Sequence, residues 1–101
     1  MDLRVEQVLE RLKNYKPEKI ILFGSRAKKT FDPYSDIDLI IIKKTKKRFL
    51  DRVKDVIKII NPDFAIDIFV YTPGEFNKMI SEGNSFLEYA IKDGQVLYEK
   101  L

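Results

Sequence analysis

The chain has 101 residues, of which 45% are hydrophobic and 35% are charged, and its formal net charge is +3 at pH 7. This length is typical of one domain with one modest core, and the charge is well below that of a dedicated nucleic-acid-binding protein. The absence of cysteine and histidine excludes disulfides, the usual zinc sites and catalysis by a Ser-His or Cys-His pair. An enzyme of this composition would use carboxylates, hydroxyls, lysine, arginine or a hard cation such as Mg²⁺.

The first segment has apolar residues at helical spacing and predicts an amphipathic helix over residues 3–15. Asp2 is suited to cap its start, and Pro17 is expected to end it. Charges within the segment argue against a signal peptide, and the sequence has no run of about 18 apolar residues that could span a membrane. We therefore expect a cytoplasmic protein with no membrane contact.

A continuous apolar stretch, Lys19–Phe23, predicts a strand that is buried on both faces. Gly24 then permits a tight turn, and Ser25 is a good N-cap for a short helix over residues 26–30. A strand that runs into such a turn presents backbone N–H groups and the positive end of a helix, which are features of a phosphate site. An isolated Gly-Ser pair would more often be an ordinary strand-to-helix turn.

The next strand, predicted over Asp36–Ile42 after a loop at residues 32–35, opens with two carboxylates. Because side chains alternate along a strand, Asp36 and Asp38 should point to the same face and could hold a divalent cation. Solvation at an exposed rim of the sheet explains this pair equally well when it is considered alone. Apolar residues on both of its faces predict that this strand is internal. If the Gly-Ser turn and the carboxylates share a site, it must also run antiparallel to the first strand.

A third carboxylate, Asp67, interrupts an apolar strand predicted over Phe64–Tyr71. A carboxylate buried in such a strand needs a partner, either a basic side chain or a metal ion. We favour a metal site shared with Asp36 and Asp38, because this explanation accounts for all three carboxylates at once.

The remaining pattern predicts a helix over residues 48–60, a helix from Pro73 to Gly83, a helix over residues 85–92 and a short strand over residues 95–99. The basic run at residues 43–48 lies at the far end of its strand, so a solvated loop is preferred to a triphosphate contact, with a partner-binding patch as the alternative. Core packing is the favoured role of Phe76, Phe86 and Tyr89, and a dimer or partner contact is the alternative. The fold class is α/β of the α+β type: one domain over residues 1–101, with a small mixed sheet flanked by helices.

Three segments together resemble the signature of the polymerase-β-like nucleotidyltransferase superfamily: F-G-S-R-A, S-D-I-D-L-I-I and A-I-D-I-F-V. The short length and the ending F-L-E-Y-A-I-K-D-G-Q-V-L-Y-E are similar to those of minimal nucleotidyltransferase (MNT) proteins. The resemblance implies the nucleotidyltransferase fold, with the triphosphate held at Gly24 and Ser25. It also implies that Asp36 and Asp38 bind two Mg²⁺ ions, and that Asp67 binds the catalytic ion and helps to activate the incoming hydroxyl.

Two positions near the Gly-Ser turn need separate comment. Arg26 is interpreted as a contact to phosphate or acceptor, with an ion pair to Asp32 or Asp36 as the alternative. Family members usually have glycine where this chain has Lys29. This departure bears on triphosphate or acceptor contacts and leaves the three aspartates of the metal site unaffected.

The resemblance also implies a biological role. MNT proteins are the antitoxin half of pairs whose other half is a HEPN-type ribonuclease, and the implied activity is transfer of AMP from ATP to a tyrosine hydroxyl of that partner. Two alternatives remain: nucleotidyl transfer to a small-molecule hydroxyl, and neutralisation of the partner by binding alone. Nucleic-acid polymerisation is not expected without a strongly basic channel. The sequence leaves the oligomeric state open.

Overall fold

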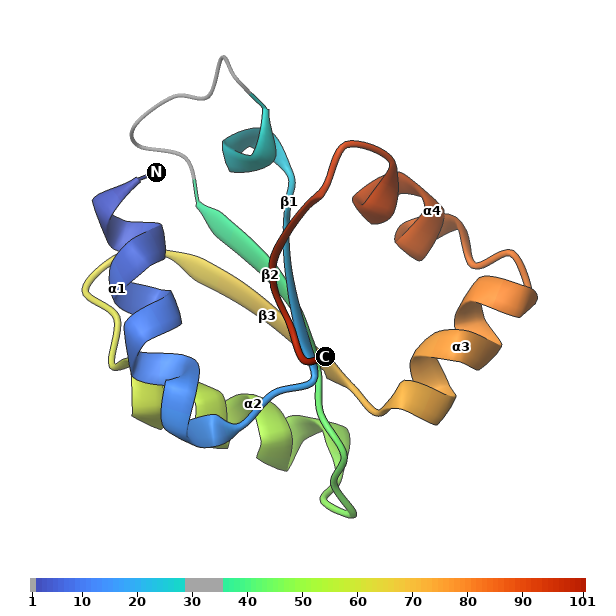
Figure 1. Cartoon of the computed structure of the whole chain (residues 1–101), viewed down its shortest axis with the longest axis horizontal. Coiled ribbons are helices and arrows are strands. Elements are labelled where there is room, and N and C mark those ends of the chain that lie inside the picture. The colour runs from blue at the N-terminus through green and yellow to red at the C-terminus, as the bar shows by residue number, and fades with distance from the viewer. Residues whose placement is uncertain (1, 29–35) are drawn as a thin grey trace.

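A four-stranded sheet with helices on both faces forms the centre of the computed structural model, which describes residues 2–28 and 36–101 (Figure 1). The strands are β1 (Lys19–Phe23), β2 (Ile37–Ile42), β3 (Ile66–Tyr71) and β4 (Gln95–Glu99). The helices are α1 (Leu3–Leu12), α2 (Phe49–Ile60), α3 (Pro73–Ser81) and α4 (Ser85–Lys92), with short 3₁₀ turns η1 (Lys13–Tyr15) and η2 (Ser25–Ala27). None of the described helices combines the length and the apolar character needed to cross a membrane.

The sheet is mixed and has the strand order β3-β2-β1-β4. Strand β1 pairs antiparallel with both β2 and β4, whereas β2 and β3 are parallel. The predicted fold class is therefore confirmed, as are the internal position of β2 and its antiparallel pairing with β1. Since β2 and β3 run the same way, the starts of both strands lie at the end of the sheet where β1 finishes.

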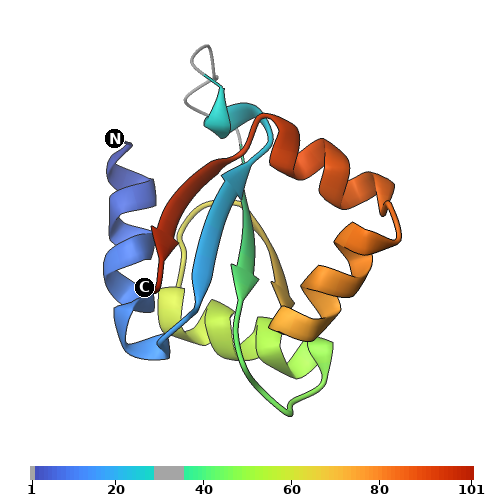
Figure 2. The same ribbon diagram turned by 45° about the vertical axis from the view of Figure 1, so that its right-hand side comes forward.

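Each face of the sheet has its own apolar core, because alternate residues of the inner strands point to opposite sides. Helices α1 and α2 cover one face, and α3 and α4 lie on the other (Figures 1 and 2). The first core contains Ile37, Leu39 and Ile41 of β2, and the second contains Ile40 and Ile42. The position of Asp38 in this alternation places it on the face of α3 and α4.

The predicted element boundaries differ from the structure mainly at strand starts and helix ends. Asp36 precedes β2, and β3 begins at Ile66 rather than at residue 64. The first helix ends as a 3₁₀ turn, which is closed by Lys16 in the left-handed conformation with φ 57° before Pro17 is reached. Asp2 caps α1 as expected, since its side chain accepts a hydrogen bond from the backbone N–H of Arg4.

The aromatic residues of α3 and α4 divide between the two predicted roles. Phe76 and Phe86 pack against the second core, whereas Tyr89 is 62% exposed. Core packing is therefore confirmed for the two phenylalanines and is wrong for the tyrosine. The reason lies in helical spacing: Leu87 and Ala90 occupy the buried side of α4 and leave Tyr89 on the outer side.

The basic segment at residues 43–48 forms a loop after β2, at the end of the sheet opposite Asp38. Its first residue, Lys43, lies over the ring of Tyr15 and donates a hydrogen bond to the Tyr15 carbonyl. Lys47 forms an ion pair with Asp55 at 2.6 Å. The loop and its place at the far end of β2 agree with the prediction, whereas the contacts of Lys43 and Lys47 give part of the segment a structural role that was not predicted.

Arg52 links α2, β3 and α3 through a buried side chain that donates to two carbonyls and one carboxylate. It donates to the carbonyls of Lys47 at 2.8 Å and Val70 at 3.1 Å, and to Glu75 Oε1 at 2.7 Å. Glu75 also completes a capping box with Thr72 at the start of α3. A single buried guanidinium thus connects three elements on both faces of the sheet.

We expect Arg52→Ala to lower the free energy of unfolding by about 3 kcal/mol, because it leaves a buried carbonyl without its donor and breaks a hydrogen-bonded ion pair. The Arg52 hydrogen bond is the main reason that the pKa of Glu75 lies below its usual value. A lowered carboxyl pKa stabilises the fold above the unfolded pKa and loses this effect as pH falls through the folded pKa. The difference in unfolding free energy between Arg52→Ala and the wild-type chain, measured by urea denaturation, should therefore be smaller in acid. Equal stability of the two proteins at pH 7 would contradict the role assigned to Arg52. Lys54→Ala, at an exposed position of α2, is the control.

Candidate active site

One row of residues crosses three strands at the end of the sheet where β1 finishes. Phe23 is paired with Asp38, and Asp38 is paired with Asp67. Partners in a row share a face of the sheet, so the two carboxylates lie next to each other on the side covered by α4. The upper end of the sheet in Figure 1 holds this row, where β1 ends and β2 and β3 begin.

The carboxyl groups of Asp38 and Asp67 interact directly. The pKa of Asp38 is raised from 3.8 to about 6, mainly by burial, then by the hydrogen bond and negative charge of Asp67, and least by the charge of Asp36. Two adjacent carboxylates of this kind repel each other unless a proton or a cation lies between them. A pair that offers only oxygen atoms fits a hard divalent cation such as Mg²⁺.

Asp67 differs from its predicted burial, and Asp36 lies just outside the strand in which it was predicted. Asp67 is the second residue of β3 and is exposed, so it is not the buried mid-strand carboxylate that the apolar pattern indicated. Asp36 is also exposed and adds its charge from just outside β2. Within residues 2–28 and 36–101, no three acidic side chains are close enough together to enclose a metal ion. The pair of Asp38 and Asp67 is therefore the centre of the acidic site.

Gly24 lies directly against this pair. Its backbone has φ 73°, and a Cβ atom built on it would lie 2.3 Å from Oδ2 of Asp38. A left-handed φ already favours glycine, and the short distance excludes any larger residue unless Asp38 moves. The turn after β1 and the carboxylate of β2 are thus in direct contact, as the antiparallel pairing required.

Where the structure describes the short helix predicted over residues 26–30, it shows a 3₁₀ turn, η2, in which Gly24 rather than Ser25 takes the N-cap position. Lys28 has already returned to extended backbone with φ −90° and ψ 151°. The carbonyl of Gly24 accepts from Ala27 at 3.2 Å, which closes the turn. Lys29 and the loop predicted at residues 32–35 lie outside the described residues.

Arg26 occupies an unexpected position. Its side chain is only 2% exposed and forms an ion pair with Asp2, which also caps α1. Of the two acidic partners considered from the sequence, Asp32 lies outside the described residues. The structure thus gives Arg26 a contact with the first helix, while a contact to phosphate stays a prediction.

Three phenylalanine rings form an apolar wall beside the carboxylate pair. Phe86 of α4 contacts Phe23 at 5.5 Å and Phe69 at 4.9 Å between ring centroids. Phe23 shares the row of Asp38 and Asp67, and Phe69 lies two residues beyond Asp67 on the same face. Such a wall lowers the local dielectric constant and strengthens the interaction of the carboxylates with a cation. The helical pattern of α4 indicated that Phe86 is buried but could not indicate its neighbours.

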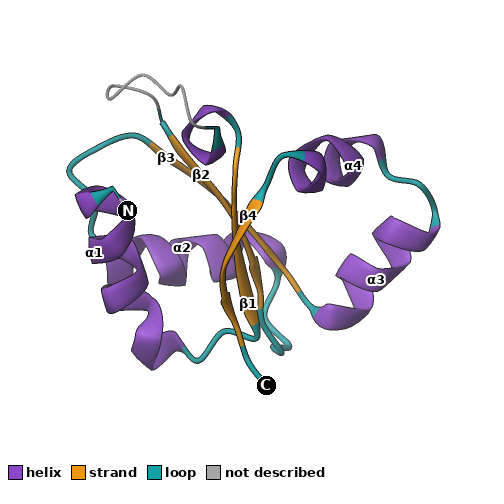
Figure 3. Cartoon of the chain, turned by 45° about the horizontal axis from the view of Figure 1, so that its top comes forward, coloured by secondary structure: helices purple, strands orange, loops and turns teal. Residues whose placement is uncertain are grey.

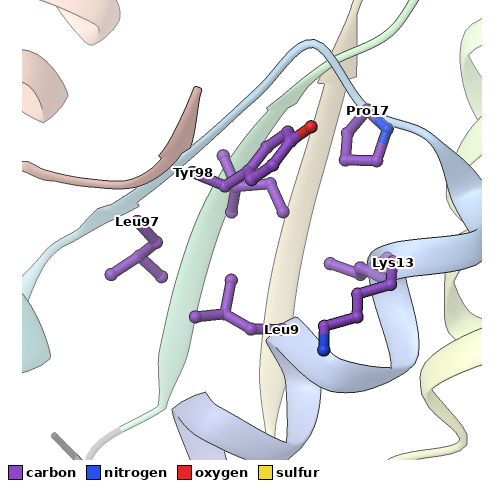
Figure 4. Close-up of a pocket in the computed structure, with 7 residues that line it drawn as sticks. Leu9, Lys13, Pro17, Leu97 and Tyr98 are labelled. Atoms are coloured by element: carbon purple, nitrogen blue, oxygen red, sulfur yellow. The ribbon is translucent and has the colours of Figure 1, made fainter. Parts of the chain in front are cut away.

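A separate apolar pocket of about 290 Å³ lies on the opposite face of the sheet, between α1 and strands β1 and β4 (Figure 4). Its lining includes Leu9, Pro17, Leu97 and Tyr98. It contains none of the carboxylates, because its strand residue Ile20 faces the core of α1 rather than that of α4. The pocket is therefore distinct from the acidic site.

Comparison with known proteins agrees with this geometry. The family model described as polymerase beta, nucleotidyltransferase matches residues 6–100. A crystal structure of a candidate nucleotidyltransferase from Sulfolobus solfataricus is similar, with a TM-score of 0.56 and 21% sequence identity. The similarity covers 99% of this chain and 90% of that chain and shows a shared fold. No curated protein matches the chain. With almost the whole chain matched by the family model and the carboxylate pair next to its glycine turn, the chain belongs to the polymerase-β-like nucleotidyltransferase family.

Proposed function

We propose that the chain is an Mg²⁺-dependent nucleotidyltransferase that transfers AMP from ATP to a hydroxyl group, specifically a tyrosine of a HEPN-type toxin, and so acts as a cytoplasmic antitoxin. The observation that supports the chemistry is the contact of Gly24 with Asp38, which is itself paired with Asp67. Family membership supports a nucleotidyltransferase, and the ATP, tyrosine and toxin assignments are our extension of it.

In the proposed reaction, Asp38 and Asp67 would hold Mg²⁺, with Asp36 contributing from the rim. Bound Mg²⁺ neutralises charge on the phosphates and on the attacking and leaving oxygens. Gly24 and Ser25 would position the triphosphate, since a glycine at this point leaves space beside the carboxylates. The acceptor hydroxyl oxygen forms a bond to the α-phosphorus, and the bond to the β-phosphate breaks. Pyrophosphate leaves, and Asp67 accepts the hydroxyl proton.

The exposure of the site favours an acceptor that comes from another molecule. Both Asp36 and Asp67 are exposed at the start of their strands, so a tyrosine on a partner surface could approach them. Phe86 and Phe69 would offer an apolar surface beside the reacting hydroxyl. Aromatic side chains pack favourably against one another, which suits a tyrosine acceptor.

The test is a label-transfer assay with Mg²⁺, each α-labelled nucleoside triphosphate in turn, and the product of the neighbouring gene, which we propose to be a HEPN-type protein. We expect label on a tyrosine of that protein, a preference for ATP, and no transfer by an Asp38→Asn/Asp67→Asn double variant. Label found only on a small-molecule hydroxyl would contradict a protein acceptor and support nucleotidyl transfer to a small molecule instead. Tight binding of the toxin by both forms without any transfer would overturn the enzymatic proposal.

A further inference from the structure

We propose that Asp2 and Gln95, from opposite ends of the chain, are positioning residues that hold the Gly24-Ser25 turn against Asp38. We call the contacts of Asp2 and Gln95 with this turn the clamp. Its effect on catalysis rests on the proposed function, whereas the clamp itself is a feature of the fold. Figure 3 shows η2 above the sheet, with the start of α1 on one side and the start of β4 on the other.

Asp2 uses its two carboxylate oxygens for different partners. Oδ1 accepts the backbone N–H of Arg4 at 2.8 Å and so caps α1, while Oδ2 accepts from the Arg26 guanidinium. The side chains are only 19% and 2% exposed, so solvent and salt screen this ion pair weakly. Because Arg26 lies within η2, the ion pair ties the turn to the first residues of α1.

Gln95 holds the turn from the other side. Its Nε2 donates a hydrogen bond of 2.7 Å to the carbonyl of Ala27, the last residue of η2. Gln95 is paired with Leu22 of β1, two residues before Gly24, so its backbone is fixed relative to the turn. Each end of the chain therefore contributes one polar side chain to the same three-residue turn.

Within the described residues, two backbone hydrogen bonds close the turn itself. Ala27 donates to Gly24 at 3.2 Å and Lys28 donates to Ser25 at 3.1 Å, and both distances lie at the upper end of the usual range for N–H···O bonds. Short 3₁₀ turns have poor hydrogen-bond geometry. A displacement of about 1 Å in a group that positions substrate can reduce the rate by roughly 100-fold. A clamp on η2 would therefore act on nucleotide binding and rate without touching the nucleotide.

The variants separate the clamp from the helix cap. Asp2→Ser keeps an oxygen that caps α1 but cannot reach the Arg26 guanidinium. Gln95→Ala removes only the donor to Ala27. Glu10→Ala is the matched control, because Glu10 is an exposed acid of α1 whose ion pair with Lys13 lies on the surface.

Two readouts are measured on the full chain: amide hydrogen exchange at Ala27 and Lys28, and the Kd of ATP in the presence of Mg²⁺. We expect exchange at both amides to accelerate at least about 10-fold in the two clamp variants, with the Kd raised about 10-fold and the rest of α1 still protected. The Glu10→Ala control should match wild type.

Unchanged exchange at Ala27 and Lys28 in both clamp variants would overturn the clamp. Faster exchange with an unchanged Kd would overturn its role in positioning nucleotide. A wild-type chain that binds no ATP would overturn the proposed function, whereas the exchange data would still decide whether the clamp exists.

Discussion

Nucleotidyl transfer by an Asp38→Asn variant is expected to fall at least about 10³-fold below the wild-type rate, because the amide lacks the negative charge that holds the cation. Asp67→Asn should have an effect of the same order, since the two carboxylates are paired across β2 and β3. Label transfer under single-turnover conditions with saturating Mg²⁺ and ATP measures the rate of the chemical step. Retention of more than a tenth of the wild-type rate would contradict the assignment.

The Asp38→Asn variant should lose activity without losing stability. The pKa of Asp38 is raised from 3.8 to about 6, so its carboxylate form is disfavoured in the folded protein without metal. The free-energy cost of holding Asp38 ionised in the fold is absent below pH 3.8, where the group is protonated in both the folded and the unfolded state. This cost is complete above pH 6. Because the group is only partly buried and solvent screens its charge, we expect a gain in unfolding free energy of only about 1 kcal/mol at pH 8.

Urea denaturation in the presence of a chelator at pH 8 and pH 4 measures this gain. It should be present at the higher pH and mostly lost at the lower one, which lies near the unfolded pKa of 3.8. A variant that is less stable than wild type at pH 8 would show that Asp38 stabilises the fold. Asp51→Asn, at an exposed position of α2 near the other end of the sheet, is the control for both stability and activity.

Gly24→Ala is expected to reduce transfer by about 100-fold or more, through displacement of the turn and of Asp38. The added Cβ would lie 2.3 Å from Oδ2 of Asp38, so the carboxylate or the backbone must move. The left-handed φ of 73° adds a strain of about 1 kcal/mol or more. Steady-state kinetics should show a lower kcat together with a higher KM for ATP.

Gly83 provides a matched control for this substitution. It has a similar φ of 70°, but a Cβ there would meet only Glu88 Oε1 at 3.6 Å, which is an ordinary contact. Gly83→Ala should therefore also place a side chain at a positive φ, but leave transfer unchanged. If both variants lost activity equally, general destabilisation rather than crowding at Asp38 would be the cause.

Much of the fold could be predicted because its elements have strong local signals. The continuous apolar run of β1, the two-sided β2 and the Thr72-Pro73 start of α3 each depend on neighbours in sequence. Adjacency of Gly24 and Asp38 could also be inferred, because a turn and a strand start can share a site only if β1 and β2 are antiparallel. The pairing of Asp38 with Asp67 was inferred from chemistry alone, since nothing in the spacing specifies the register of two parallel strands.

The parts that could not be predicted depend on partners far apart in the chain. Residues 26–30 have the composition of a helix, yet the part of them that the structure describes forms a 3₁₀ turn that ends at Ala27, and Lys28 is extended. Arg26 and Asp2 are 24 positions apart, and Arg52 and Glu75 are 23 apart. A charged residue in a sequence indicates that it needs a partner when buried, but not which residue supplies it.

The most direct test of the account is a titration of Mn²⁺, as a paramagnetic substitute for Mg²⁺, into the full chain with ATP, followed by electron paramagnetic resonance. We expect Mn²⁺ to bind in the presence of ATP to the wild-type chain and to Asp51→Asn, and binding to weaken at least about 10-fold in Asp38→Asn and in Asp67→Asn. Equal Mn²⁺ binding by all four proteins would contradict the claim that these two carboxylates hold the metal beside the Gly24 turn.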